Sequence, residues 1–218
     1  MSIETARGVR LPRGQRKQQL LAAALHVFVQ TGYHAASMDE IAAQAGVTKP
    51  VLYQHFGSKR DLYMAVLEAG SEDFLATIRQ ALESTTNNEG RVEATVAAYL
   101  EFVNREDATY RLLFESDLVN SPDVRNTVRR VDDICAAMLS QVIAADTGLS
   151  AEEATLLAYG MLGMAMAAAK YFLTTDDELT TESAATLLGA LSWKGISGFP
   201  KSHPPKSATS AESEQFEK

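Results

Sequence analysis

The chain has 218 residues, of which 46% are hydrophobic and 22% charged, and its net charge is -8. This composition fits a globular protein with a sizeable core and excludes collagen-like, disulfide-rich and largely disordered classes. The single cysteine, Cys135, cannot form an internal disulfide, and no apolar run with a cleavage site stands near the N-terminus, so we expect a cytoplasmic protein.

Apolar residues recur at three- and four-residue steps along most of the chain, whereas alternation at every second residue is scarce. The pattern predicts an all-α fold of about nine helices. Three helix starts carry a serine followed three residues later by an acidic residue, at Ser37, Ser58 and Ser150. We expect helices at about 13–31, 37–46, 48–54, 58–82, 91–105, 107–117, 121–148, 150–174 and 180–193.

Two short predicted helices flank a tight turn at Gly46, within the stretch SMDEIAAQAGVTKPVLYQHFGSKRDL. Glycine permits the left-handed backbone that a sharp reversal between helices needs. Apolar residues such as Ile41 and Leu52 would face inward, as they do in a helix-turn-helix. The second helix of such a motif can enter a major groove of DNA with its N-terminal end.

The residues expected to face outward on and around the second helix are suited to DNA. Lys49 can donate to guanine acceptors, Thr48 can reach a base edge or a phosphate, and other polar side chains can bind backbone oxygens. The candidate DNA-binding residues are Arg13, Arg16, Ser37, Thr48, Lys49, Pro50, Tyr53, His55 and Lys59.

Charge is distributed unevenly along the chain. Residues 1–60 hold eight of the 20 Lys and Arg but only three of the 28 Asp and Glu, which gives this part +5 and the rest -13. A helical hairpin with a solvated basic face is the alternative, since helix-turn-helix geometry also occurs in proteins that do not bind DNA. That alternative leaves the concentration of positive charge unexplained.

The stretch GYHAASMDEIAAQAGVTKPVLYQHFGSKRDLY resembles the N-terminal signature of the TetR family of one-component transcriptional regulators, over about residues 13–67. The resemblance implies an all-helical homodimer whose N-terminal domains bind a palindromic operator and whose C-terminal domains bind a small inducer. Pro50 departs from the Gly or Ala that the family often has there. The matching residues are Gly32, Tyr33, Ser37, Ile41, Ala42, Ala45, Gly46, Val47, Tyr53, Phe56, Lys59 and Leu62.

A narrower resemblance within this family is to the fatty-acid-synthesis regulators of mycolate-making actinobacteria. It is carried by RLPRGQRKQQLL, KPVLYQHFGSK and YRLLFESDLV. It implies control of fatty-acid synthase genes, with long-chain acyl-CoA as effector, although composition and spacing do not themselves indicate that ligand. A regulator of efflux or catabolic genes with another apolar effector is the alternative.

The predicted organisation has four parts. A flexible basic arm covers residues 1–12, and a three-helix helix-turn-helix domain covers 13–57. A larger C-terminal helical bundle for ligand binding and dimerisation covers 58–198. The tail over 199–218, rich in Pro, Ser, Lys and Glu, is expected to be disordered.

The predicted helices of the C-terminal domain carry soft and aromatic residues that could line a cavity for an elongated apolar ligand. Plain core packing is the alternative for each of them, because apolar residues at helical spacing are usually core. The run Leu156–Ala169 is uncharged but shorter than the roughly 20 residues of a membrane span. The candidate ligand-binding residues are Tyr99, Phe102, Val103, Leu113, Phe114, Ile134, Met138, Met161, Met164 and Phe172.

The last predicted helix, through Leu187, Leu188, Leu191 and Ile196, is expected to pair with its copy in a homodimer, together with the small-residue face at Gly160 and Gly163. Cys135 stands on an apolar helix face, where a buried, inert thiol is expected. Arg125, Arg129 and Arg130 form a basic cluster that is either a solvated face or a site for a ligand phosphate.

The chain has no nucleophile elbow, phosphate-binding loop, dinucleotide fingerprint or metalloprotease motif, and its four histidines lack metal-ligand spacing. We therefore expect no catalytic residue, no metal and no cofactor. Three hypotheses stand in order: a ligand-gated DNA-binding regulator, an apolar-ligand carrier that does not bind DNA, and an enzyme of unrecognised type.

Overall fold

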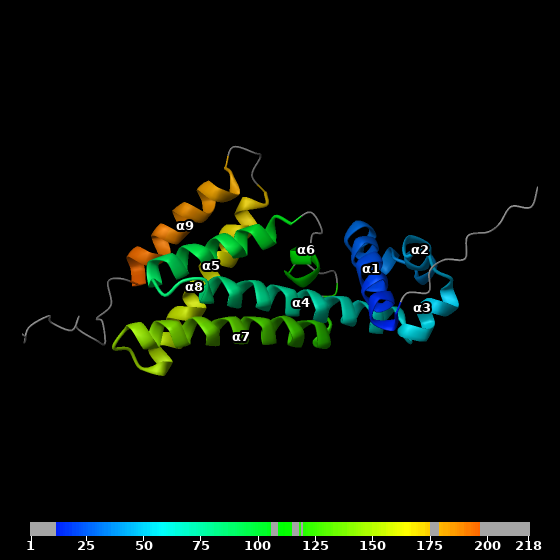
Figure 1. Cartoon of the computed structure of the whole chain (residues 1–218), viewed down its shortest axis with the longest axis horizontal. Coiled ribbons are helices and arrows are strands. Elements are labelled where there is room, and N and C mark those ends of the chain that lie inside the picture. Colours follow the sequence, from blue (N-terminus) through cyan, green and yellow to red (C-terminus); the bar gives the residue numbers. More distant parts are fainter. Residues whose placement is uncertain (1–11, 106–108, 115–117, 119, 175–178, 197–218) are drawn as a thin grey trace, which may run out of the picture. The chain divides into compact units, whose positions relative to one another are not determined.

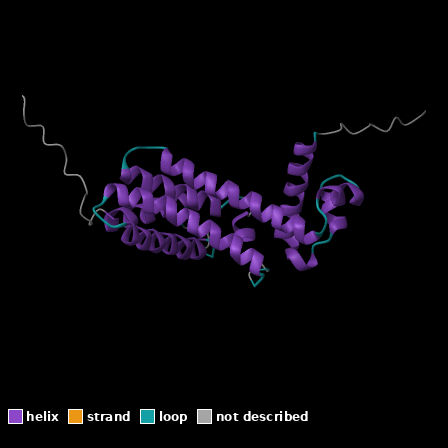
Figure 2. Ribbon diagram, turned by 90° about the horizontal axis from the view of Figure 1, so that it is seen from below, coloured by secondary structure: helices purple, strands orange, loops and turns teal. Residues whose placement is uncertain are grey.

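The computed structural model describes residues 12–105, 109–114, 118, 120–174 and 179–196. Every regular element in these residues is a helix (Figures 1 and 2), which confirms the all-α prediction. The helices are α1 (Arg13–Ala35), α2 (Met38–Gln44), α3 (Lys49–His55), α4 (Lys59–Glu83), α5 (Asn88–Val103), α6 (Thr109–Phe114), α7 (Pro122–Asp146), α8 (Ala151–Phe172) and α9 (Thr181–Ile196).

The helix starts follow the capping residues closely. Ser150 forms a complete capping box, because its hydroxyl accepts from the Glu153 N–H while the Glu153 carboxylate accepts from the Ser150 N–H. Ser37 and Ser58 make half of this arrangement, each accepting from the backbone N–H three residues on, at 3.1 Å. The serine signals therefore locate the starts of α2, α4 and α8.

The regular part of α1 ends at Gly32, as predicted. Gly32 has a non-helical conformation (φ 75°, ψ 164°), and a short helical turn up to Ala35 follows it within the bounds of α1. Because glycine has no Cβ, it adopts this positive φ with little strain and lets a further helical turn form after the bend. The last turn then delivers the chain to Ser37, the residue that caps α2.

The chain divides into two compact units, each described by itself. The first runs to Gln80 and resumes from Ala98 to Val131, and the second comprises Ala81–Ala97 and the chain after Val131. α4, α5 and α7 each contribute residues to both units. The predicted division at residue 58 remains a prediction, and the tail over 199–218 and most of the arm lie outside the described residues.

Small residues allow close helix packing in the second unit. Ala136 and Ile143 of α7 form a buried cluster with Ala154 and Ala158 of α8. The hydroxyls of Ser140 and Thr155 share a hydrogen bond of 3.0 Å between the same two helices. α8 packs in turn on α9.

Candidate nucleic-acid interface

The first three helices form one packed group. α1 packs on α2, and α2 packs on α3 (Figure 1). Leu20, Ile41 and Leu52, one from each helix, are fully buried. Burial of such side chains provides most of the stability of short helices, which are marginal in isolation. The packing thus fixes α3, a helix of seven residues, in one orientation on α2.

The turn between α2 and α3 has the backbone that the sequence predicts. Gly46 has φ 64°, and its N–H donates to the Ala43 carbonyl at 3.0 Å, while the Val47 N–H donates to the Ala42 carbonyl at 2.9 Å. A side chain from α1 also supports this turn, since the Gln19 amide donates to the Ala45 carbonyl at 2.8 Å. The turn is therefore held by its own backbone and by α1.

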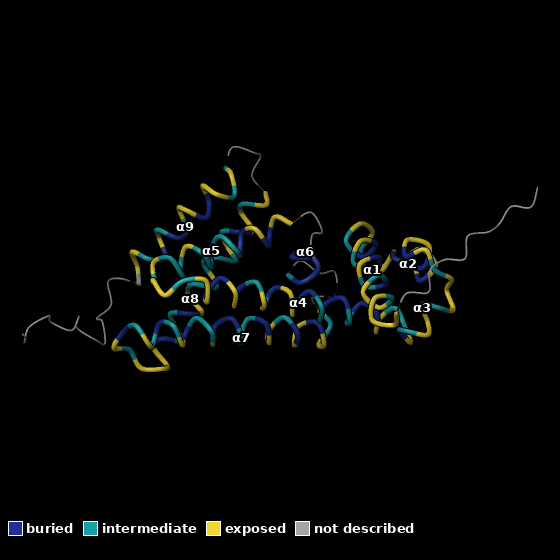
Figure 3. Tube along the Cα trace, in the orientation of Figure 1, coloured by how far each residue is buried: buried dark blue, intermediate teal, exposed yellow. Residues whose placement is uncertain are grey.

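α3 separates an inward face from an outward face. Leu52 is buried, whereas Lys49, Pro50 and Tyr53 are exposed, and Tyr53 is 44% exposed. Most of the α3 trace is exposed or half-buried (Figure 3). Thr48 occupies the N-cap position of α3, but it makes no side-chain cap hydrogen bond. Its exposed hydroxyl is thus not used by the helix, and His55 lies half-buried at the other end.

Lys49 is paired with an acidic residue of the preceding helix. Its Nζ donates to Oδ2 of Asp39 at 2.8 Å, and both side chains are exposed. The hydrogen bond to Asp39, together with the charge of Asp39, raises the pKa of Lys49 above its usual value. Lys49 therefore remains charged at neutral pH and points to the α2 side of the α3 N-terminus.

Lys59, a predicted phosphate contact, is engaged inside the protein. Its ammonium donates to the carbonyls of Tyr33 and Ala36, both at 2.8 Å, and to that of His34 at 3.3 Å. The same ammonium lies 4.6 Å from the centre of the Tyr33 ring, a cation–π distance. Lys59 thus holds the α1–α2 connection, and its contact with DNA remains a prediction.

The other predicted DNA-binding residues lie in the same group of helices. Arg13 is exposed at the start of α1, and Arg16 is half-buried and donates to the Gln19 side chain at 2.7 Å. Ser37 is exposed, and its hydroxyl oxygen accepts the α2 capping bond. Arg7 and Arg10, which belong to the basic arm over residues 1–12, lie outside the described residues.

Half of the predicted ligand-binding residues fall in the first unit. Tyr99, Phe102, Val103 and Leu113 are buried and Phe114 is half-buried. Phe74 lies at the centre of this region, with ring centres 4.9 Å from Phe102, 5.6 Å from Phe114 and 5.9 Å from Tyr99. The aromatic cluster, as we name it, comprises Phe74, Tyr99, Phe102, Tyr110 and Phe114.

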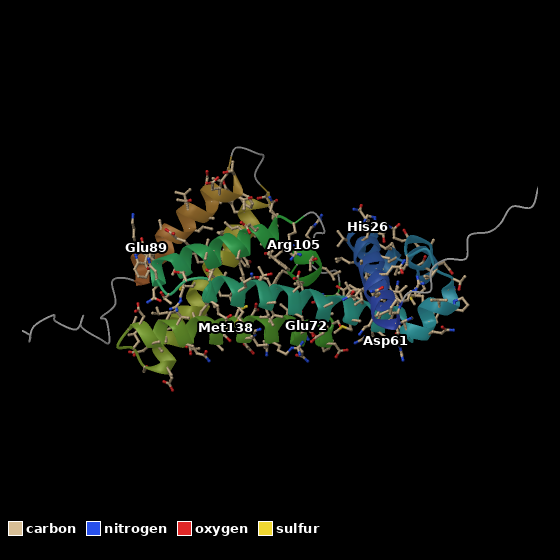
Figure 4. All side chains as sticks on the ribbon, in the orientation of Figure 1. His26, Asp61, Glu72, Glu89, Arg105 and Met138 are labelled. Carbon is tan, nitrogen blue, oxygen red and sulfur yellow. The ribbon has the colours of Figure 1, made fainter. Side chains whose placement is uncertain are left out.

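Arg105 closes one side of the aromatic cluster just beyond α5 (Figure 4). Its guanidinium pairs with Asp73 at 2.6 Å and lies 5.1 Å from the centre of the Phe102 ring. The other five predicted ligand-binding residues belong to the second unit and are all half-buried: Ile134, Met138, Met161, Met164 and Phe172. Met161 packs against the buried α7–α8 cluster.

Cys135 is buried, as predicted, and burial raises the pKa of its thiol to about 12, with Asp132 adding to the shift. Such a thiol stays protonated and unreactive. In the predicted basic cluster of α7, Arg130 pairs with Glu68 of α4. No group of three potential metal ligands occurs within the ranges that the structure describes.

Three residues that make contacts in this region were not predicted from the sequence. Asp39 and Gln19 contact the α3 region from neighbouring helices, and Phe74 centres the aromatic cluster. The opposite charges of Asp39 and Lys49, ten residues apart on either side of the Gly46 turn, could have suggested this pair. The other two contacts depend on how helices cross, which no local spacing specifies.

A short exposed helix with a basic N-terminal residue, supported by a glycine turn and a buried hydrophobic face, has the geometry of a helix-turn-helix, the motif that places its second helix in a major groove of DNA. The model for bacterial regulatory proteins of the tetR family matches residues 20–66. The chain is 43% identical over 194 residues to the HTH-type transcriptional activator FasR of Mycolicibacterium smegmatis, and the match covers 89% of each protein. The chain belongs to the TetR family.

Solved structures agree with this assignment. A TetR-like transcriptional regulator from Rhodococcus sp. RHA1 is 28% identical, with a TM-score of 0.70 over 87% of this chain and 100% of that one. The fatty acid degradation regulator FadR of Bacillus halodurans has the same fold. It is 19% identical, with a TM-score of 0.70 over 85% of this chain and 98% of that one.

The family assignment confirms the predicted class of function. The protein is a DNA-binding transcriptional regulator rather than an enzyme, and it binds operator DNA as a homodimer and also binds a small-molecule effector. No described helix, including the apolar α8, is long and apolar enough to cross a membrane.

Proposed function

We propose that this regulator controls genes of fatty-acid synthesis and that long-chain acyl-CoA is its effector. Two observations support the regulon: the resemblance of three segments to fatty-acid-synthesis regulators, and the 43% identity with FasR over most of both chains. Such a regulator acts in the cytoplasm, where bacterial chromosomal DNA lies.

The position of α6 is the observation that supports a response of DNA binding to an effector. α6 packs on α1, the helix that supports α2 and the α2–α3 turn. It also packs very closely on α4, because a Cβ added at Gly70 would lie 2.8 Å from Cγ2 of Thr109. In the first unit, α6 therefore touches both the helix-turn-helix group and the helix that carries Phe74.

The aromatic cluster supplies the chemistry for an acyl chain. Tyr110 and Phe114 of α6 belong to it, and their rings contact Phe74 and Tyr99 of α4 and α5. An alkyl chain inserted among these rings would bury apolar surface, at roughly 25 cal/mol for each Å² removed from water. The insertion would also displace α6, because its rings already fill the space beside Phe74.

We propose that this displacement moves α1 and the start of α4, and so changes the distance between the two recognition helices of the homodimer. Operator binding requires both α3 helices to fit consecutive major grooves. The effector shifts operator affinity only to the extent that it binds the two conformations differently. The residues that we propose for contact with DNA are Thr48, Lys49 and Tyr53.

An exposed apolar face supports the placement of the homodimer interface on α8 and α9. Leu156 and Tyr171 of α8 and Leu187 and Leu191 of α9 are exposed, although apolar side chains are usually buried. Gly160 and Gly163 have nothing within 4 Å of an added Cβ, so a second helix can approach closely there. We propose that these faces pair in the homodimer.

The proposal is tested by fluorescence anisotropy with a labelled duplex from the promoter of the host's fatty-acid synthase genes. Palmitoyl-CoA is added at increasing concentration, with CoA and a short-chain acyl-CoA as matched controls. We expect palmitoyl-CoA to change duplex affinity at least fivefold, within the usual range of allosteric coupling, while CoA has no effect. Binding of the duplex with no response to palmitoyl-CoA would overturn the effector.

The alternatives give different outcomes in the same experiment. A TetR-type regulator of efflux or catabolic genes would ignore the fatty-acid synthase promoter while binding another duplex. An apolar-ligand carrier would bind palmitoyl-CoA but no duplex at all. The residue-level proposal is tested with Phe102→Ala, which should abolish the response to palmitoyl-CoA and leave the affinity of the ligand-free protein for DNA within about threefold.

A further inference from the structure

We infer that Asp39 sets how strongly this protein distinguishes its operator from other DNA, because it holds the ammonium of Lys49. The inference rests on the proposed role of Lys49 at the DNA surface. Asp39 is a positioning residue here: it acts through Lys49 and need not contact a base.

Asp39 and Lys49 both lie at the N-terminal end of a helix. Asp39 lies in the first turn of α2, where the helix dipole favours a negative charge, so its carboxylate is well placed with or without a partner. Lys49 is the first residue of α3, where the same dipole disfavours a positive charge. The 2.8 Å bond to Asp39 therefore stabilises an ammonium at the end of α3 that approaches DNA.

Stability of the fold does not account for this pair. The two side chains are 47% and 68% exposed, and ion pairs between exposed side chains contribute little to folding. Water and salt screen the attraction in the unbound protein. On approach to DNA the screening falls, and the carboxylate becomes a nearby alternative to the phosphates as the partner of Lys49.

The pair has opposite consequences on random and operator DNA. On a random duplex, an ammonium that stays on Asp39 neutralises no phosphate and releases no counterion, so the sequence-independent part of the affinity is reduced. On the operator, guanine N7 and O6 accept from the ammonium with a geometry that phosphates do not offer. Only the contact of the Lys49 ammonium with guanine offsets the weakening of its bond to Asp39.

The experiment uses the full-length protein and two duplexes. One is selected by the protein from a randomised duplex library, and the other is a scrambled duplex of the same composition. Asp39→Asn is compared with Glu40→Gln, which removes the same charge one residue away. Glu40 has no ion pair among the residues that the structure describes, so it is the matched control.

We expect Asp39→Asn to raise affinity for the scrambled duplex roughly three- to tenfold and to leave affinity for the selected duplex within about twofold. For the scrambled duplex, the slope of log K against the logarithm of the salt concentration should become steeper by about 0.9, which corresponds to one added phosphate contact. Glu40→Gln should change both affinities alike and leave the slope unaltered. In a Lys49→Ala background, Asp39→Asn should lose its selective effect.

Several results would overturn the inference. One is that Asp39→Asn changes the ratio of the affinities for the selected and scrambled duplexes no more than Glu40→Gln does. Another is that Asp39→Asn has the same effect in the Lys49→Ala background as in the wild-type protein. Circular dichroism and the thermal midpoint check the fold, and Asp39→Ser replaces Asp39→Asn if the latter disturbs α2. The proposed DNA-binding role fails separately, and visibly, if the wild-type protein enriches no sequence from the library.

Discussion

The outward face of α3 and the aromatic cluster belong to the same compact unit, but their side chains have opposite relations to solvent. Lys49, Pro50 and Tyr53 are exposed, whereas Phe74 and Phe102 are 2% and 1% exposed. Exposed side chains add little to packing, so their chemistry can suit a partner without affecting the fold. In the buried cluster, any residue that meets an effector also stabilises the core. A mutation at α3 should therefore change binding alone, whereas a mutation in the cluster that changes effector binding should also lower the stability of the fold.

Truncation of one aromatic ring in each region should give the largest difference in stability. Phe74→Ala should lower the free energy of unfolding by about 3–5 kcal/mol, because it removes a buried ring and leaves a cavity. Tyr53→Ala should change it by no more than about 0.5 kcal/mol. Urea unfolding followed by circular dichroism measures both, and equal losses would contradict the assignment of the two faces.

The close packing of α6 on α4 can be tested with a compensating pair. Gly70→Ala should destabilise the protein by about 1–3 kcal/mol, since the new methyl group meets Cγ2 of Thr109 at 2.8 Å. Thr109→Ser removes that methyl group and retains the hydroxyl, so the double variant should recover most of the loss. Urea unfolding of the single and double variants gives the coupling, and additive losses would show that the two residues do not meet.

Tyr53→Phe tests the outward face by binding instead of stability. Loss of a hydrogen bond to a charged phosphate should weaken binding about tenfold, equally on the selected and the scrambled duplex. The thermal midpoint should stay unchanged, because the hydroxyl is removed from an exposed side chain. Fluorescence anisotropy measures the affinities, and a loss confined to the selected duplex would assign Tyr53 to a base instead.

The second unit should give the protein a pH dependence. Burial, followed by the charge of Asp133, raises the pKa of Asp132 from 3.8 to about 6. The folded protein then holds this proton more tightly than the unfolded chain, so stability falls as pH rises from about 4 to about 6 and stays constant above. Since Asp132 is half-exposed, we expect a loss of about 1 kcal/mol.

Urea unfolding across this pH range measures the effect of Asp132. Asp132→Asn should remove the dependence, whereas Asp133→Asn should keep most of it, because burial is the larger cause. A variant at Asp132 that leaves the slope unchanged would assign the dependence to another group.

The smallest expected difference lies between two cap positions. Ser37→Ala should lower the free energy of unfolding by about 0.5–1 kcal/mol, because it removes the hydroxyl that accepts from the Glu40 N–H. Thr48→Ala should lower it by a few tenths at most, since Thr48 makes no such bond. Thermal unfolding compares the two, and Thr48→Ala should instead weaken binding to DNA.

The sequence predicts the helix-turn-helix well because each of its signals is local. The Ser37 cap, the positive φ of Gly46 and the burial of Leu52 depend on residues only a few positions apart. The aromatic cluster could not be predicted as a whole, because its members come from α4, α5 and α6 and meet only through helix packing. Phe74 resembles an ordinary core residue until its neighbours are known.

The short turn after Gly32 shows another limit of local signals. Gly32 ends the regular part of α1 as predicted, but the chain then makes a further helical turn before α2. Lys59, 27 residues after Gly32, contacts this turn, since its ammonium binds the carbonyls of Tyr33 and Ala36. No spacing within α1 itself carries that information.

Binding of the outward face of α3 in the major groove of DNA can be tested by methylation protection of guanine N7. On the selected duplex, the wild-type protein should protect guanines in two symmetric half-sites. Lys49→Ala should lose protection at one guanine in each half-site while retaining the rest. Identical patterns with the wild-type protein and Lys49→Ala, or protection confined to minor-groove positions, would contradict the claim.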